Sequence, residues 1–132
     1  MGMPPTRTSL NSVVSWILQI LLALLFAVQG IVKLMGSPSW IAHFSQWGYP
    51  QHFYLVVGVA ELAGAVLLLI PRLTRLGALL LSVIMIGAAG THLFHHEPQV
   101  VTTLILLALL GTVLFLRSRL SLERMPANER SS

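Results

Sequence analysis

The stretch Tyr54-Leu-Val-Val-Gly-Val-Ala-Glu-Leu-Ala-Gly-Ala-Val-Leu-Leu-Leu-Ile70 decides the fold class of this chain. It is apolar enough to lie in a bilayer, it contains one carboxylate, Glu61, and Pro71 follows it. A charged side chain near the middle of a membrane helix costs roughly 2.5–3.5 kcal/mol, so it usually faces the protein interior and a partner. Gly58 and Gly64 lie three residues to either side of Glu61, and small residues there let another helix approach closely. The stretch therefore predicts a membrane helix whose Glu61 side faces other helices.

The composition extends this prediction to the whole chain. Of the 132 residues, 55% are hydrophobic and only 9% are charged, whereas a soluble domain carries about 25% charged residues. A membrane span needs roughly 20 mostly apolar residues, and four stretches meet that need: 10–32, 53–70, 73–93 and 98–116. We therefore expect an all-α integral membrane protein, a four-helix bundle embedded in the lipid bilayer.

The basic residues give the orientation. Seven of them lie before the first span, between the second and third, or after the fourth: Arg7, Arg72, Arg75, Arg117, Arg119, Arg124 and Arg130. Only Lys33 lies on the other side, so the positive-inside rule places both termini of this multi-pass protein in the cytoplasm. Residues 1–9 are then a disordered cytoplasmic lead, residues 10–116 the transmembrane domain and residues 117–132 a basic cytoplasmic tail.

Two classes of function are excluded. The sequence pI is about 10.8, but the basic residues stand singly at helix ends without interleaved aromatics, so we expect no nucleic-acid partner. The chain has no cysteine, which rules out thiolate catalysis, disulfide exchange and Cys-ligated metals within this chain.

The connection between the first two spans predicts a short helix of its own. Trp40, Ile41, Phe44 and Trp47 follow one another at helical spacing, and Pro38 suits a helix start. Tryptophans on an amphipathic segment favour the membrane interface. We expect a short interfacial helix that is either an aromatic anchor or a lid over an outward-facing pocket.

Polar side chains gather in the outer half of the predicted bundle, the half that faces away from the cytoplasm. They are Gln29, Lys33, Tyr54, Glu61, Thr91, His92, Gln99, Thr102 and Thr103, whereas the inner half is almost purely aliphatic apart from Gln19, Ser82 and Thr112. This asymmetry predicts a pocket closed on its inner side by leucines. Our candidate ligand-binding residues are Glu61, Lys33, His92, Gln29, Tyr54 and Thr103. The structural alternatives are that Glu61 only links two helices and that Lys33 extends to the lipid headgroups.

A histidine-rich segment, His92-Leu-Phe-His-His-Glu-Pro98, follows the third span. His92 and either His95 or His96 are three or four residues apart, a spacing that could present two imidazoles to a metal or haem. Pro98 disfavours helix at Glu97, however, and surface histidines need no ligand. We expect no metal site, with His92 facing the bundle.

Three short motifs resemble the DoxX family of small bacterial four-helix membrane proteins. They are Gly30-Ile-Val-Lys-Leu-Met-Gly36, Gly58-Val-Ala-Glu-Leu-Ala-Gly64 and Arg72-Leu-Thr-Arg-Leu-Gly-Ala78, and the resemblance covers residues 10–116. The family takes its name from a subunit associated with thiosulfate:quinone oxidoreductase, so the resemblance implies a redox-linked protein of the bacterial inner membrane. Lys33 and Glu61 match the family's recurring polar positions, and the resemblance carries no proven catalytic role with it.

Two hypotheses about function follow. In the first, the chain is the membrane subunit of a quinone-linked redox system, in which Glu61, Lys33 and His92 contact a quinone. These side chains supply no electrons, so a redox-complex partner protein is required. In the second, it is a non-enzymatic membrane scaffold or a protein that binds lipophilic small molecules. The sequence leaves open whether the chain is an enzyme and whether it forms a homo-oligomer.

Overall fold

The computed structural model describes residues 7–123 and residue 128. Within them the chain is all-α, without a strand, as predicted. The helices are α1 (Arg7–Leu34), α2 (Pro38–Gln46), α3 (Phe53–Leu69), α4 (Thr74–Phe94) and α5 (Gln99–Glu123). Most of the predicted lead and half of the predicted tail lie outside the described residues.

Three of the helices are long and apolar enough to cross a membrane: Leu10–Leu34 of α1, Thr74–Phe94 and Gln99–Leu120 of α5. The shorter α3 is equally apolar and has 17 residues, which at 1.5 Å per residue extends about 26 Å. Large aliphatic side chains are exposed along the outside of the bundle, as on Leu24 at 60% and Val83 at 66%. The molecule is an integral membrane protein whose apolar surface suits lipid.

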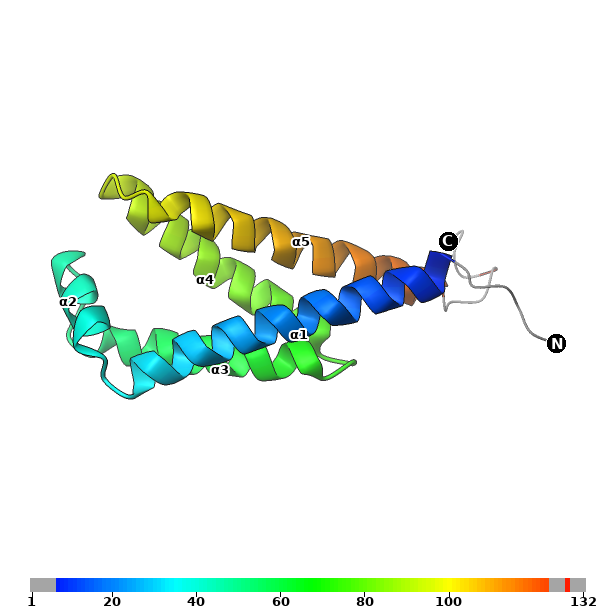
Figure 1. The fold of residues 1–132 in the computed structure, drawn as a ribbon, viewed down its shortest axis with the longest axis horizontal. Helices are drawn as coiled ribbons and strands as arrows, with labels where there is room; N and C mark the ends of the chain where they lie inside the picture. The colour runs from blue at the N-terminus through cyan, green and yellow to red at the C-terminus, as the bar shows by residue number, and fades with distance from the viewer. Residues whose placement is uncertain (1–6, 124–127, 129–132) are drawn as a thin grey trace.

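The four long helices form a closed ring in which α1 contacts α3, α3 contacts α4, α4 contacts α5 and α5 contacts α1. The turn between α3 and α4 is short, so these helices are antiparallel neighbours. Toward the end that carries α2, the α4–α5 pair diverges from the α1–α3 pair (Figure 1). The ring is therefore narrow at one end and wide at the other.

Glycines fix the closest contacts in the ring. A Cβ atom added to Gly30 of α1 would lie 2.7 Å from the carbonyl oxygen of Gly58 in α3. A Cβ on Gly77 of α4 would lie 2.9 Å from the carbonyl oxygen of Gly64 in α3. Because these obstacles are backbone atoms, the two helix crossings require residues without side chains.

The helical spacing of Gln19, Phe26, Gly30 and Lys33 places these residues on one side of α1, and the structure buries that side. Gln19 and Phe26 are almost fully buried, Lys33 is 4% exposed, and Gly30 is buried. Phe26 belongs to a core cluster with leucines of the other three long helices, among them Leu68, Leu81 and Leu110.

The narrow end of the ring corrects the expectation of an almost purely aliphatic inner half. Gln19 accepts hydrogen bonds from Ser15 Oγ at 2.7 Å and from Arg117 Nε at 2.6 Å, and it donates to the Leu68 carbonyl oxygen at 2.8 Å. Thr74 Oγ1 donates to the same carbonyl at 3.1 Å. Arg117, which the sequence assigned to the tail, lies inside α5 and is only 7% exposed. A buried polar network thus joins all four long helices.

Candidate functional site

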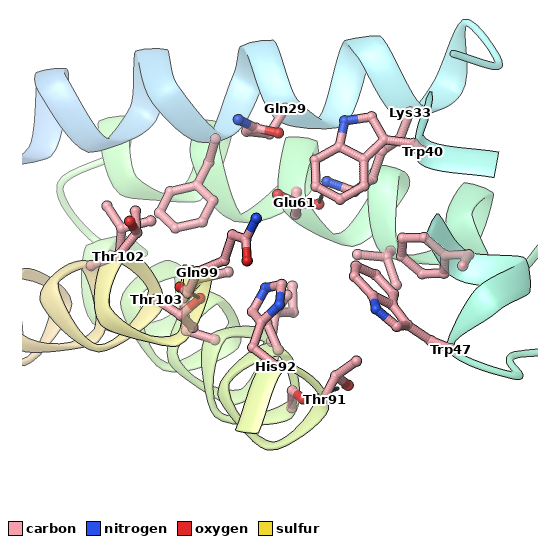
Figure 2. A pocket seen from close by; sticks show the side chains of 18 of the residues that line it. Gln29, Lys33, Trp40, Trp47, Glu61, Thr91, His92, Gln99, Thr102 and Thr103 are labelled. Atoms are coloured by element: carbon pink, nitrogen blue, oxygen red, sulfur yellow. Dashed lines mark hydrogen bonds and ion pairs between the residues drawn. The ribbon is translucent and has the colours of Figure 1, made fainter. Parts of the chain in front are cut away.

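A cavity of about 530 Å³ occupies the wide end of the ring, and residues from all five helices line it. One part of the lining is aromatic: Phe26, Trp40, Phe44, Trp47, Tyr49 and Phe53. The polar part consists of Gln29, Lys33, Glu61, Thr91, His92, Gln99, Thr102 and Thr103. Figure 2 shows Gln29, Glu61, Gln99 and His92 directed toward a common centre from different helices. The cavity is therefore mainly apolar, with a few convergent polar groups, as is usual for ligand pockets.

A buried ion pair lies in the cavity wall. Lys33 Nζ is 2.7 Å from Glu61 Oε1, and the two side chains are 5% and 3% exposed. Each residue follows, by three positions, one of the glycines of the α1–α3 crossing, Gly30 and Gly58. The close approach of the two backbones therefore brings the two charges together. Lys33 points into the bundle and does not extend to the headgroups.

The ammonium group of Lys33 has a second neighbour in α2. It lies 3.9 Å from the centroid of the Trp40 ring, which is the geometry of a cation–π interaction. The Lys33 charge is thus shared between a carboxylate and an aromatic face, and the ion pair is tied to the helix that covers the cavity.

Helix α2 lies across the wide end of the ring (Figure 1). Trp40 and Phe44 of α2, with Trp47 just after it, line the cavity, and Phe44 is only 6% exposed. The Phe44 ring contacts those of Trp47 and Tyr49 at centroid distances of 5.3 and 5.6 Å. Glycines with positive φ, Gly36 at 73° and Gly48 at 84°, turn the chain on either side of α2. Of the two interpretations of this segment, the arrangement favours the lid.

The lid is attached to α4 and to the α4–α5 connection. Trp47 Nε1 donates a hydrogen bond to Glu97 Oε1 at 2.9 Å, and Tyr49 forms a hydrogen bond with Thr91 of α4. The same Glu97 oxygen lies 3.1 Å from His92 Nδ1. The hydrogen bond with His92 lowers the pKa of the Glu97 carboxyl below its ordinary value. Glu97 therefore joins a residue of the lid to a residue of the cavity.

The histidines of the histidine-rich segment point in different directions within the described part of the chain. No three His, Asp or Glu side chains gather there as metal ligands. His92 lines the cavity and pairs with Glu97, His95 is half-buried against the Phe94 ring, and His96 is exposed. The α4 helix ends at Phe94, which separates His95 and His96 from the face of His92.

Five of the six candidate ligand-binding residues line this cavity: Gln29, Lys33, Glu61, His92 and Thr103. Tyr54 does not, and Tyr49 and Phe53 take its place. At 100° per residue, Phe53 and Val57 precede Glu61 on the cavity side of α3, whereas Tyr54 lies on the side of Gly58, toward α1. The Tyr54 ring instead neighbours the Phe44 ring at 6.4 Å.

Sequence reasoning missed two features of the site. The sequence identified Glu97 only as a member of the histidine-rich segment, although this carboxylate contacts both Trp47 and His92. It also did not predict that Trp40 would contact the Lys33 ammonium. The contacts of Glu97 had one signal in the sequence, a carboxylate directly before Pro98 at the end of a membrane helix. Such a residue lies in a helix connection, where it can contact a lid.

Comparisons with known proteins identify the family of this chain. Residues 17–114 match the model of the DoxX-like family. The chain is 30% identical over 92 residues to "Uncharacterized protein YdgD" of Bacillus subtilis (strain 168), which covers 67% of this chain and 81% of that protein. It is 31% identical over 75 residues to "Putative oxidoreductase CatD" of the same organism, and this match spans 57% of this chain and only 56% of the relative. No solved structure matches the chain. The family match covers most of the membrane-embedded helices, and the chain therefore belongs to the DoxX-like family.

Proposed function

We propose that this protein binds the head group of a membrane quinone in the cavity at the wide end of the helix ring and serves as the membrane subunit of a redox system. The observation that carries the proposal is the buried Lys33–Glu61 ion pair in the wall of an aromatic cavity. Ionisable residues inside a membrane bundle are expensive and usually mark a functional site. One relative carries the name "Putative oxidoreductase CatD", which supports the redox assignment.

The charges of the cavity favour a neutral ligand. Lys33 and Glu61 neutralise each other at 2.7 Å, and His92 lies beside the Glu97 carboxylate. A ligand with a net charge would therefore enter a desolvated site that offers no unpaired countercharge among these four groups. A quinone ring is neutral, flat and apolar on its faces, which suits the rings of Trp40, Trp47 and Phe53.

The polar groups suit the edges of such a ring. The Lys33 ammonium donates hydrogen bonds, Gln99 both donates and accepts, and His92 offers a ring nitrogen. Interconversion of quinone and quinol moves two electrons and two protons. An imidazole such as that of His92 can exchange protons, whereas the electrons must pass to or from a redox partner protein. In this proposal Lys33 orients a carbonyl oxygen and His92 exchanges a proton.

The test is the quinone content of the protein after purification in mild detergent, together with its visible spectrum. We expect about one quinone per chain in the wild type and its loss in Glu61→Gln and Lys33→Met. Ser15→Ala is the matched control, because Ser15 is polar and fully buried but lies outside the cavity. A wild-type protein that contains no quinone and shows no saturable binding of a short-chain quinone would overturn the proposal.

One observation favours the second hypothesis, a non-enzymatic scaffold or lipophilic ligand-binding protein. Lys33 is satisfied within the molecule by Glu61 and Trp40, as expected if the pair only joins α1, α2 and α3. Under this hypothesis the purified protein contains no quinone and copurifies with no redox protein.

We also propose that all four long helices cross the bacterial inner membrane, with α2 on the outer side and both termini in the cytoplasm. Arg72 on the α3–α4 connection and Arg75 in the first turn of α4 are exposed at the narrow end, on the same side as Arg119. Residues 10–116 then form the transmembrane domain. Reporter fusions after residue 132 and in the 47–52 connection test this orientation, since only the first should report a cytoplasmic location.

A further inference from the structure

Glu97 lies outside the cavity but contacts two residues that line it. Its Oε1 atom is 2.9 Å from Trp47 Nε1 and 3.1 Å from His92 Nδ1. The Trp47 and His92 rings meet edge to face with centroids 5.4 Å apart, so each ring restricts the other. The His92 side chain is 13% exposed and that of Glu97 is 25% exposed. The carboxylate thus reaches the surface, while the imidazole is held below it.

These contacts define the hydrogen-bonding role of each ring nitrogen. An indole N–H can only donate, so the shared Glu97 oxygen acts as an acceptor. His92 Nδ1 faces the same oxygen and therefore carries the proton of the imidazole. The lowered pKa of the Glu97 carboxyl agrees with an ionised acceptor at neutral pH. In the neutral imidazole, Nε2 is then the unprotonated nitrogen, which can only accept a hydrogen bond.

The position of the ring directs Nε2 away from Glu97. His92 belongs to the cavity lining and Glu97 does not, and Nε2 lies across the ring from Nδ1. Figure 2 shows His92 pointing into the cavity between Gln99 and Trp47. The other charged or titratable groups that line the cavity are Lys33, Glu61 and Tyr49, and His95 acts on Glu97 from the α4–α5 connection.

We propose that Glu97 is a positioning residue that holds His92 with its proton on Nδ1, so that the cavity presents Nε2 as an acceptor for a hydroxyl group. The ligand class follows from this polarity. A quinol carries hydroxyl donors, whereas the corresponding quinone carries only carbonyl acceptors. The reduced ring is therefore the preferred occupant. The ligand class rests on the proposed function, whereas the position of the His92 proton on Nδ1 does not depend on it.

The preference depends on the contact between Glu97 and His92 Nδ1. Glu97→Ala removes the acceptor that fixes Nδ1–H, and it should abolish the preference at neutral pH.

Two measurements test the proposal on the full-length protein in detergent. The first is the 15N spectrum of histidine-labelled protein, with His92→Gln for assignment; we expect the tautomer protonated on Nδ1 in the wild type and a mixture in Glu97→Ala. The second is the affinity for trimethylhydroquinone relative to that for trimethylbenzoquinone. Both affinities are measured by the quenching of tryptophan fluorescence under anaerobic conditions. One hydrogen bond predicts a preference of about fivefold for the hydroquinone, lost in Glu97→Ala. His96→Asn is the matched control, because His96 is exposed and its φ of 54° is tolerated by Asn.

The outcomes separate this proposal from the proposed function. If the wild type binds neither ring, the quinone function fails, and the tautomer alone decides the role of Glu97. If both rings bind equally, or if Glu97→Ala keeps the fivefold preference, the positioning role is overturned while quinone binding stands. A wild-type spectrum with the proton on Nε2 overturns the proposal outright.

Discussion

Replacement of Lys33 by methionine should destabilise the protein strongly, and a second replacement, Glu61→Met, should restore most of the loss. Methionine keeps the length of the Lys33 stem but removes its ammonium, which leaves the Glu61 carboxylate without its ion pair in the described structure. In the double variant neither charge remains, and two apolar side chains of similar length fill the same space.

The magnitude follows from the geometry of the pair. At the observed separation of 2.7 Å, two unit charges attract by about 6 kcal/mol at an effective dielectric constant of about 20. Desolvation of both ions offsets much of this attraction, so the pair itself has a small net effect on stability. When one partner is removed, the attraction is lost, but the remaining charge is still buried away from water. This uncompensated charge lowers the free energy of unfolding by about 3–5 kcal/mol. The cation–π contact of Lys33 with Trp40 adds about 0.5–2 kcal/mol to the loss.

The assay is reversible unfolding in mixed micelles, with the fraction of SDS at the midpoint as the measure of stability. We expect Lys33→Met to lower the free energy of unfolding by about 3.5–7 kcal/mol, and the double variant, which loses only the cation–π contact, to lie within about 2 kcal/mol of the wild type. A loss below about 1 kcal/mol for Lys33→Met would mean that the pair behaves as an exposed one. Equal losses in the single and double variants would show that the two charges are not coupled. Either result would refute this account of the ion pair.

Three further variants test other parts of the structure. Gly30→Ala should destabilise the α1–α3 crossing by roughly 1–3 kcal/mol, because its Cβ would meet a backbone oxygen at 2.7 Å; the unfolding midpoint measures this. Gln19→Met should cost about 1–3 kcal/mol or more by the same assay, because it leaves several buried polar partners without their hydrogen bonds. The pKa of Glu97 is lowered in the folded state, so its contribution to stability is present at neutral pH and is lost as the pH falls through that lowered pKa; Trp47 fluorescence should report this acid transition in the wild type but not in Glu97→Gln.

Each of these predictions has a contradicting result. Gly87→Ala is the control for the first, since a Cβ there meets open space, and equal losses for Gly30 and Gly87 would rule out steric crowding. A fully stable Gln19→Met protein would show that the network at the narrow end contributes little. An acid transition that survives in Glu97→Gln would assign it to another group.

The fold was largely predictable because the membrane limits the choices. The apolar stretches and the connections too short for anything but antiparallel neighbours define helices α1, α3, α4 and α5. The helical spacing of Gln19, Gly30 and Lys33 within an otherwise aliphatic segment also predicted the buried side of α1. The relative shift between helices distant in sequence was not predictable. The hydrogen bond between Gln19 and Arg117 joins residues 98 positions apart, and no local pattern gives the depth at which α1 meets α5.

The candidate site shows the same division. A carboxylate and an ammonium in neighbouring membrane helices need partners, so Lys33 and Glu61 could be selected from the sequence. Tyr54 does not line the cavity, because on α3 it lies beyond Glu61 on the side of Gly58, toward α1. Trp47 and Glu97 meet only when the lid and the α4–α5 connection are both in place. Such a contact depends on tertiary structure alone.

The buried network at the narrow end also has a mechanical consequence. Gln19, Leu68, Thr74 and Arg117 tie all four long helices at one level, and the glycine crossings prevent α3 from sliding along α1 or α4. The helix pairs α1–α3 and α4–α5 can therefore be regarded as two arms joined at a pivot, with a cavity of about 530 Å³ between their opposite ends, which the lid connects. A small rotation at the pivot would be amplified over the length of the arms, so we expect occupancy of the cavity to change hydrogen exchange at α2 and the α4–α5 connection and to leave the pivot unchanged.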